Sequence, residues 1–176
     1  MRILALESSA VAASACIQED GKILGEFYSN TRQTHSQTLL PMVRTLLRDT
    51  GTQVKDLDLL AVSAGPGSFT GVRIGVACVK GMAFPNDTPC CGVSTLEAMA
   101  MNLRQSSALV CAVMDARCGQ VYNALFTTGE GEVCRLTEDR ALSIEELAAE
   151  CPNWMEKTGK PLVLVGDGAQ LCFDAP

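Results

Sequence analysis

A glycine-rich turn constrains this chain more than any other feature. The stretch A-G-P-G-S-F-T-G-V-R-I-G runs from Ala64 to Gly75 and holds four glycines and one proline. It follows the apolar run Leu57–Val62 and precedes a long apolar segment. Because glycine has no Cβ, such spacing indicates backbone in unusual dihedrals or in close contact with another group. That group is either a phosphate, which favours an enzyme, or a second helix, which favours a partner-binding protein.

The standard phosphate-binding motifs do not match this turn. A Walker loop requires G-x-x-x-x-G-K-[ST], and the sequence holds no Gly-Lys-Ser or Gly-Lys-Thr. A dinucleotide-binding turn requires G-x-G-x-x-G, whereas Gly65, Gly67 and Gly71 follow G-x-G-x-x-x-G. Any helix N-terminus can still hold an anion, so this weaker possibility stays open.

The segment after the turn is predicted to be a helix from Thr70 to about Phe84 with little polar surface. Small residues form one stripe along it, and only two side chains mark a polar edge: the stripe is Gly71, Gly75, Cys78 and Met82, and the edge is Arg73 and Lys80. A helix that is apolar nearly all round is buried on more than one side. The second cover is either a partner or a neighbouring helix of the same chain. If it is a partner, Gly75→Leu abolishes its binding and leaves the monomer folded.

Composition excludes several classes of protein. The chain has 176 residues, is 47% hydrophobic and 19% charged, and carries a net charge of −6. These values are typical of a globular protein with a real core. A net negative charge argues against unaided nucleic-acid binding, which needs a basic surface. No apolar run approaches the roughly 18 residues that span a bilayer, and the short N-terminal apolar run before Glu7 does not fit a signal peptide.

Cysteine and histidine usage indicates a reduced, cytoplasmic protein without a metal. Nine cysteines are present, none in a C-x-x-C pair, and most lie inside apolar runs where cysteine acts as a small hydrophobe. His35 is the only histidine, so a structural zinc site is not expected. We expect His35 to be an ordinary residue at the start of a helix.

Two halves of the chain share one order of predicted elements. Each begins with a buried strand that ends in an acid, Glu7 or Asp115, and continues through two further strands, a helix and a strand. This pattern predicts an α/β protein with two related βββαβα domains, residues 1–104 and 105–176. Ser94 and Ser143, each followed three residues later by glutamate, are predicted to start helices with capping boxes.

Five segments resemble the bacterial TsaB (YeaZ) family, which takes part in threonylcarbamoyladenosine modification of tRNA. The matching segments are R-I-L-A-L-E-S-S, T-H-S-Q-T-L-L-P-M-V, D-L-D-L-L-A-V-S-A-G-P-G-S-F-T-G-V-R-I-G, G-V-S-T-L-E-A-M-A and V-M-D-A-R-C-G-Q-V-Y. The resemblance extends over the whole chain, and G-P-G-S-F-T-G-V-R-I-G is its most specific part. It implies an actin-like/Hsp70-like/sugar-kinase fold of two related domains.

The resemblance also implies a role and partners. A TsaB-like chain is a non-catalytic scaffold for threonylcarbamoylation of adenosine 37 in tRNAs reading ANN codons. It binds the catalytic paralogue TsaD, joins TsaE in a larger complex, pairs as a homodimer when alone, and meets tRNA only indirectly. TsaC supplies the threonylcarbamoyl-adenylate. The helix after the glycine turn would carry the interface, with residues Gly71, Val72, Arg73, Ile74, Gly75, Cys78, Val79 and Met82.

An ATP-dependent enzyme of the same fold is the alternative. Its residual anion or nucleotide site would use Glu7, Ser8, Ser9, Gly65, Gly67, Ser68 and Asp115. The resemblance favours no cofactor in the isolated chain, with ATP or ADP present only in the complex with TsaD and TsaE. The chain departs from the family at Glu7, where aspartate is usual, and at Pro176, where the family continues. The second domain is therefore expected to be incomplete.

Overall fold

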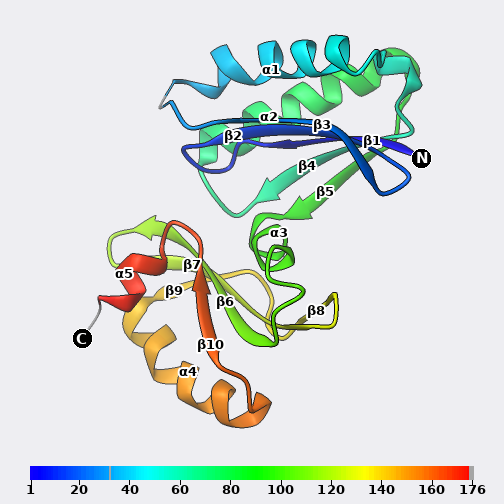
Figure 1. Cartoon of the computed structure of the whole chain (residues 1–176). Coiled ribbons are helices and arrows are strands. Elements are labelled where there is room, and N and C mark those ends of the chain that lie inside the picture. Colours follow the sequence, from blue (N-terminus) through cyan, green and yellow to red (C-terminus); the bar gives the residue numbers. More distant parts are fainter. Residues whose placement is uncertain (32, 175–176) are drawn as a thin grey trace. The chain divides into compact units, whose positions relative to one another are not determined.

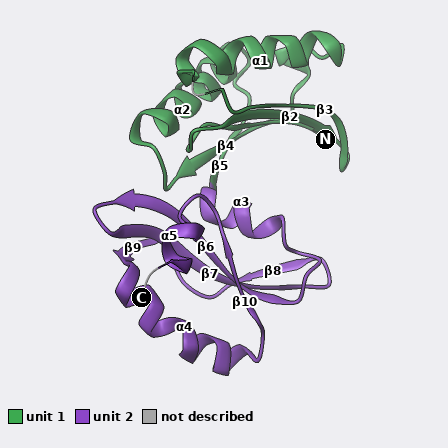
Figure 2. Ribbon diagram, turned by 60° about the vertical axis from the view of Figure 1, so that its left-hand side comes forward, with its two compact units in different colours: residues 1–93 green, residues 94–176 purple. Residues whose placement is uncertain are grey.

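The computed structural model describes residues 1–31 and 33–174. The chain folds into two compact units, Met1–Val93 and Ser94–Pro176, and each unit has its own β-sheet (Figure 2). The sequence places the boundary later, after residue 104. The difference concerns helix α3 (Thr95–Met101), which packs against three strands of the second unit.

The first unit is a five-stranded sheet in the order β3-β2-β1-β4-β5, with two helices packed on one face (Figure 1). β1 pairs with β2 in antiparallel and with β4 in parallel orientation. The elements, in chain order, are β1 (Arg2–Glu7), β2 (Ala13–Glu19), β3 (Lys22–Ser29), α1 (His35–Asp49), the short 3-10 helix η1 (Val54–Asp56), β4 (Leu59–Gly65), α2 (Phe69–Ala83), the short 3-10 helix η2 (Phe84–Asn86) and β5 (Cys90–Ser94).

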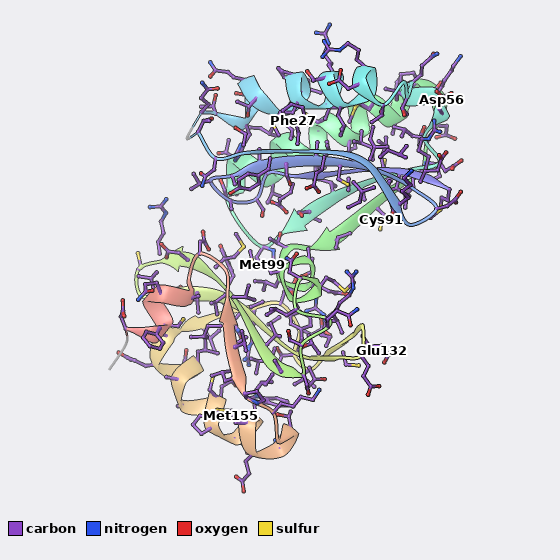
Figure 3. The ribbon with its side chains drawn as sticks, viewed as in Figure 1. Phe27, Asp56, Cys91, Met99, Glu132 and Met155 are labelled. Carbon is purple, nitrogen blue, oxygen red and sulfur yellow. The ribbon has the colours of Figure 1, made fainter. Side chains whose placement is uncertain are left out.

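One core joins the sheet of the first unit to both helices. Alternate residues of β1 and β2, such as Leu4 and Ile17, are fully buried, as a period of two requires for a sheet with one covered face. α1 adds Leu39, Met42, Val43 and Leu46 at helical spacing. Phe27 of the edge strand β3 lies on the same side of the sheet as α1 (Figure 3). The core therefore fixes which face each helix turns toward the sheet.

The second unit repeats this construction on a sheet in the order β10-β6-β7-β8. β6 pairs with β7 in antiparallel and with β10 in parallel orientation, as β1 does with β2 and β4. Strand β9 is an addition that pairs with the other half of β7. The predicted βββαβα order is thus confirmed in both halves. After α3 the elements are β6 (Ala108–Arg117), β7 (Gln120–Gly129), β8 (Glu132–Arg135), β9 (Arg140–Ser143), α4 (Ile144–Thr158), β10 (Leu162–Val165) and α5 (Ala169–Phe173).

The two predicted capping boxes have different outcomes. At α4 the Ser143 hydroxyl accepts the Glu146 N–H at 3.1 Å, and the Glu146 carboxylate accepts the Ser143 N–H at 2.9 Å, so the box is confirmed. At α3 the Ser94 hydroxyl accepts the Glu97 N–H at 3.2 Å, but the reciprocal bond is missing. The Glu97 carboxylate binds Arg135 at 2.8 Å instead. A stronger charged partner has displaced half of the box.

None of the helices formed by the described residues combines the length and the apolar character needed to cross a bilayer.

Candidate functional site

The backbone of the same chain approaches the glycine turn. A Cβ on Gly67 would lie 2.5 Å from the carbonyl oxygen of Ser9, in the connection between β1 and β2. That oxygen accepts a hydrogen bond from the N–H of Ser68 at 2.6 Å. The first donor at the start of α2 is therefore used within the first unit, so a bound anion is not needed to satisfy it.

The next two glycines on α2 face the same connection. A Cβ on Gly71 would lie 2.0 Å from the carbonyl oxygen of Ser8, and one on Gly75 would lie 2.6 Å from the Ser8 hydroxyl. The Ser8 hydroxyl donates to the carbonyl oxygen of Gly71 at 2.9 Å. These glycines let the helix axis come close to the end of β1, which no side chain on this face would permit.

His35 links the start of α1 to this arrangement. Its Nε2 lies 2.7 Å from the carbonyl oxygen of Ala10, and a Cβ on Gly71 would lie 3.3 Å from its Cδ2. The residue begins α1, as the sequence predicts. His35 Nδ1 and Ser9 Oγ are buried and have no hydrogen-bond partner within residues 1–31 and 33–174. The connection Ser8–Ala10 is thus bonded to the first turns of both helices.

The two strand-end acids close their own turns. A carboxylate oxygen of Glu7 accepts the N–H of Ser9, and one of Asp115 accepts the N–H of Arg117 at 2.7 Å. Both are bonds from residue i+2 to the side chain of residue i, placed where the first strand of each unit ends. The acids therefore have the same local role in both units.

The glycine turn is also repeated. Gly65-Pro66-Gly67 begins at the last residue of β4, and Gly166-Asp167-Gly168 follows β10. Gly65 and Gly166 have φ of +110° and +117°, which side chains rarely adopt. A Cβ on Gly166 would lie 2.0 Å from the carbonyl oxygen of Val113. In each unit a Gly-x-Gly turn packs against the end of the first strand.

The predicted anion-site residues fall into two groups. Six of them gather at the β1 end and the α2 start in the first unit, where the glycine turn packs against Ser9: these are Glu7, Ser8, Ser9, Gly65, Gly67 and Ser68. Asp115 belongs to the second unit, where its N–H donates to the Asp167 carboxylate at 3.3 Å. An anion or nucleotide site on these residues stays a prediction. In the parts of the chain that are described, no group of three or more His, Cys, Asp or Glu side chains is arranged to hold a metal ion.

Comparison with known proteins identifies the family. A family model described as TsaD, tRNA N6-adenosine threonylcarbamoyltransferase, matches residues 22–170. The Escherichia coli protein named tRNA threonylcarbamoyladenosine biosynthesis protein TsaB is 37% identical over 172 residues, covering 97% of this chain and 73% of that protein. The chain belongs to the TsaB family. The Bacillus subtilis TsaB is 31% identical, with the same two coverages.

Solved structures agree with the TsaB (YeaZ) assignment. YeaZ from Pseudomonas aeruginosa superposes with a TM-score of 0.75 at 35% identity, over 82% of this chain and 68% of that one. A second structure, described as similar to peptidase YEAZ from Pseudomonas aeruginosa, gives a TM-score of 0.79 at 30% identity, over 94% and 83%. EutJ from Carboxydothermus hydrogenoformans, at 11% identity and a TM-score of 0.56, shares the fold alone.

The α2 helix of this TsaB-family chain has two opposed faces. Every fourth residue on the inner face is buried against the sheet of the first unit: Gly71, Gly75, Val79 and Ala83. The outer face exposes Phe69 by 70% and, just past the helix end, Phe84 by 89%. Arg73 lies over the Phe69 ring with its Cζ 3.4 Å from the ring centroid. We call Phe69, Arg73, Ala77, Lys80 and Phe84 the outer stripe; all five are exposed.

The outer stripe differs from the stripe predicted from the sequence. Of the eight predicted interface residues, three are buried inside the first unit, four are partly buried and only Arg73 is exposed: the buried ones are Gly71, Gly75 and Val79, and the partly buried ones are Val72, Ile74, Cys78 and Met82. A leucine at Gly75 would overlap the Ser8 hydroxyl and would also meet Val62, whose Cγ2 lies 3.1 Å from a Cβ there. Gly75→Leu would therefore disturb the packing of the first unit, so this variant does not separate partner binding from folding.

Sequence reasoning missed Phe69, Ala77 and Phe84. Their positions along the segment place them on one side of a helix, together with Arg73 and Lys80, so helical periodicity could have identified the outer stripe. The glycines drew attention to the opposite face because small residues occur both where helices meet partners and where they pack on their own sheet. Only the contact with Ser8 distinguishes the two cases.

Proposed function

We propose that this chain takes part in threonylcarbamoyladenosine formation on tRNA as a non-catalytic subunit that binds a TsaD-type paralogue. The names of its E. coli and B. subtilis relatives support the pathway. The match of the TsaD family model to residues 22–170 supports a shared architecture with the proposed partner. The homodimer of the isolated chain and the larger assembly with TsaE belong to the same proposal.

The outer stripe of α2 carries the proposal. Two exposed phenylalanines sit on one helix face with a small residue, Ala77, between them. Phenylalanine side chains bury large apolar areas when they are covered, and interfaces are enriched in aromatic residues and arginine. The glycine face of α2 is already used inside the first unit, so the partner docks on the opposite face.

The turns at the strand ends support the non-catalytic part of the proposal. The carboxylates of Glu7 and Asp115 each accept a backbone N–H of their own turn. The start of α2 is joined to Ser9 rather than left open. The two carboxylates and the carbonyl oxygen of Ser9 therefore stabilise turns within their own units. In the proposal, nucleotide chemistry belongs to the partner complex.

Co-purification with the TsaD homologue of the same genome tests the proposal. We expect the wild-type chain to form a stable complex, and Ala77→Glu and Phe84→Glu to lower its affinity by at least about tenfold, because each buries an unpaired charge at the interface. Met155→Glu is the matched control, since Met155 is an exposed apolar residue of α4 in the second unit (Figure 3). Circular dichroism checks that each variant is folded.

Unchanged affinity in both outer-stripe variants would exclude the outer stripe as the docking face. Calorimetric titration of the isolated chain with ATP separates the scaffold from the ATP-dependent enzyme. Saturable binding with turnover would favour the enzyme, and its absence together with complex formation would favour the scaffold.

A further inference from the structure

The outer stripe of α2 has a regular order of side chains. Phenylalanines lie at its two ends, an alanine lies in the middle, and one cation lies between the middle and each end: the order is Phe69, Arg73, Ala77, Lys80 and Phe84. Arg73 and Lys80 are seven residues apart, which is nearly two helical turns, so they project from one side of the helix about 10 Å apart along its axis. The stripe is therefore apolar at its ends and centre and positively charged at two fixed points.

Acidic side chains are nearly absent from the two helices that cover the first sheet. α1 and α2 pack on one face of that sheet and contact each other (Figure 1), and together they carry four arginine or lysine residues but only one acid, Asp49. Asp49 is the last residue of α1 and pairs with its neighbour Arg48. The whole chain has the opposite balance, with a net charge of −6. The cations of the outer stripe thus have no acid on their own helix.

Both cations of the stripe keep their charge available to a partner. Arg73 and Lys80 are exposed, and neither forms an ion pair with any residue that the structure describes. The Arg73 Cζ lies 3.4 Å from the centroid of the Phe69 ring. This stacking uses the flat face of the guanidinium and leaves the N–H groups at its edge to bind a carboxylate with two parallel hydrogen bonds. The ring therefore orients the guanidinium before a partner binds, which lowers the entropy cost of docking.

We propose that the outer stripe docks on a helix of the partner that presents two carboxylates, one opposite Arg73 and one opposite Lys80. The inference rests on the proposed function, because it names the chemistry of the partner face that meets the stripe. The small side chain of Ala77 lets the axis of a second helix approach closely, and the two phenylalanines pack on apolar side chains at the ends of the contact. Acids seven positions apart on the partner helix match the spacing of the two cations when the helices cross at a shallow angle.

The same two charges disfavour a second copy of this chain on the stripe. If two copies of α2 crossed at Ala77 about a two-fold axis, Arg73 of each copy would lie beside Lys80 of the other, because these residues are four positions before and three positions after Ala77. Like charges placed together across an interface repel and suppress that pairing. The stripe therefore favours an acidic partner over self-association, and a homodimer through it is the weaker complex.

Zero-length crosslinking of the complex with the TsaD homologue tests the proposal. A carbodiimide joins a lysine amine to a carboxylate that touches it, and mass spectrometry of the digest identifies the two residues. We expect Lys80 to be joined to an aspartate or glutamate of the partner. Lys80→Arg keeps the charge without the reactive amine, so it should lose this crosslink and keep the affinity. Arg73→Lys should add a second crosslink, to an acid seven residues from the first. Lys22 of β3, an exposed lysine of the same unit, should remain without a crosslink to the partner.

Charge reversal measures what the two contacts contribute. Arg73→Glu and Lys80→Glu should each weaken the complex by about tenfold at low salt and by less at high salt, whereas Lys22→Glu should leave the affinity unchanged. A complex that keeps wild-type affinity in both reversed variants and gives no crosslink at Lys80 would overturn the acidic-partner inference while the scaffold function stands. Absence of any complex with the wild-type chain would instead refute the proposed function. Binding of tRNA to the isolated chain that Lys80→Glu abolishes would assign the cations to phosphates and would also overturn the inference.

Discussion

The hydroxyl of Ser8 donates a hydrogen bond to the carbonyl oxygen of Gly71 across 63 positions of sequence, at a distance of 2.9 Å. The bond joins the end of β1 to the first turn of α2. It exists because Gly71 has no side chain in the space that the Ser8 backbone occupies. The glycine turn and the β1–β2 connection are therefore one structural unit, and substitutions on either side should be coupled.

Gly71→Ala should destabilise the chain strongly. Its Cβ would lie 2.0 Å from a backbone carbonyl oxygen, which cannot move aside as a side chain can. Overpacking of this kind costs about 3 kcal/mol of unfolding free energy. Urea unfolding followed by circular dichroism measures the change.

Gly81→Ala on the same helix is the matched control. It is exposed, and its Cβ would meet no atom within 4 Å. Alanine is a better helix former than glycine by about 1 kcal/mol, so this variant should be slightly more stable than wild type. Equal loss of stability in both variants would contradict the packing role of Gly71.

Gly75→Ala and Ser8→Ala should be coupled in a double-mutant cycle. A Cβ on Gly75 would lie 2.6 Å from the Ser8 hydroxyl, and Ser8→Ala removes that oxygen together with its hydrogen bond. Each single change should cost about 1 kcal/mol or more, and the double change should cost about 1 kcal/mol less than their sum. Thermal unfolding of the four proteins measures the coupling. Ser8→Ala combined with Gly81→Ala should instead be additive.

Acid should loosen the start of α4. The backbone and hydroxyl of Ser143 lower the pKa of Glu146 below its ordinary value of 4.5. A carboxyl with a lowered pKa in the folded state stabilises that state above its ordinary pKa, and this contribution is lost as the pH falls through the folded value. Hydrogen exchange at the first turn of α4 should therefore accelerate as the pH falls below about 4.5, relative to the intrinsic rates.

Glu146→Gln should show this weakened cap already at neutral pH and little further loss on acidification. Glu145→Gln is the control, because Glu145 is the exposed neighbour in the same turn. If both variants keep the acid response of the wild type, the response belongs to another group.

Asn123→Ala should destabilise the second unit. The amide of Asn123 is fully buried and bonds Cys111, the Ala112 carbonyl oxygen and Arg140. Its removal takes a hydrogen bond from each of these groups and opens a small cavity, at a cost of about 2 to 4 kcal/mol, while Arg140 keeps its ion pair with Glu150. Chemical unfolding measures the loss. Asn153→Ala on the exposed side of α4 should change stability by less than about 0.5 kcal/mol.

Much of the fold was predictable because it depends on local patterns. The two expected buried strands that end near Glu7 and Asp115 are present as β1 and β6. Leu39, Val43 and Leu46 recur at helical spacing and are buried in α1. The Ser143 capping box is local and was correct, whereas that of Ser94 lost its second half to Arg135, which lies far along the sequence.

The candidate site was less predictable because its contacts are not local. The glycine spacing indicated a close approach, but the approaching group, Ser8, lies more than sixty residues away. The predicted stripe continued from Gly75 to Cys78, whereas the buried line continues to Val79. Both directions fit a helix, and only the position of the sheet decides between them. Once the position of the sheet fixes the buried side of the helix, Phe69 and Phe84 lie on the opposite side and are exposed.

In sequence, the two Gly-x-Gly motifs differ only at the middle position, which is Pro66 in one unit and Asp167 in the other. Gly65, Gly67 and Gly166 have positive φ angles that side chains rarely adopt, and a Cβ on Gly168 would lie 3.0 Å from the backbone carbon of Met114. The middle position carries a proline in one turn and a carboxylate in the other. The backbone of such a turn therefore constrains its two outer positions and leaves the middle position free to vary. The halves of this chain can therefore acquire different chemistry at matching places while their shared scaffold remains unchanged.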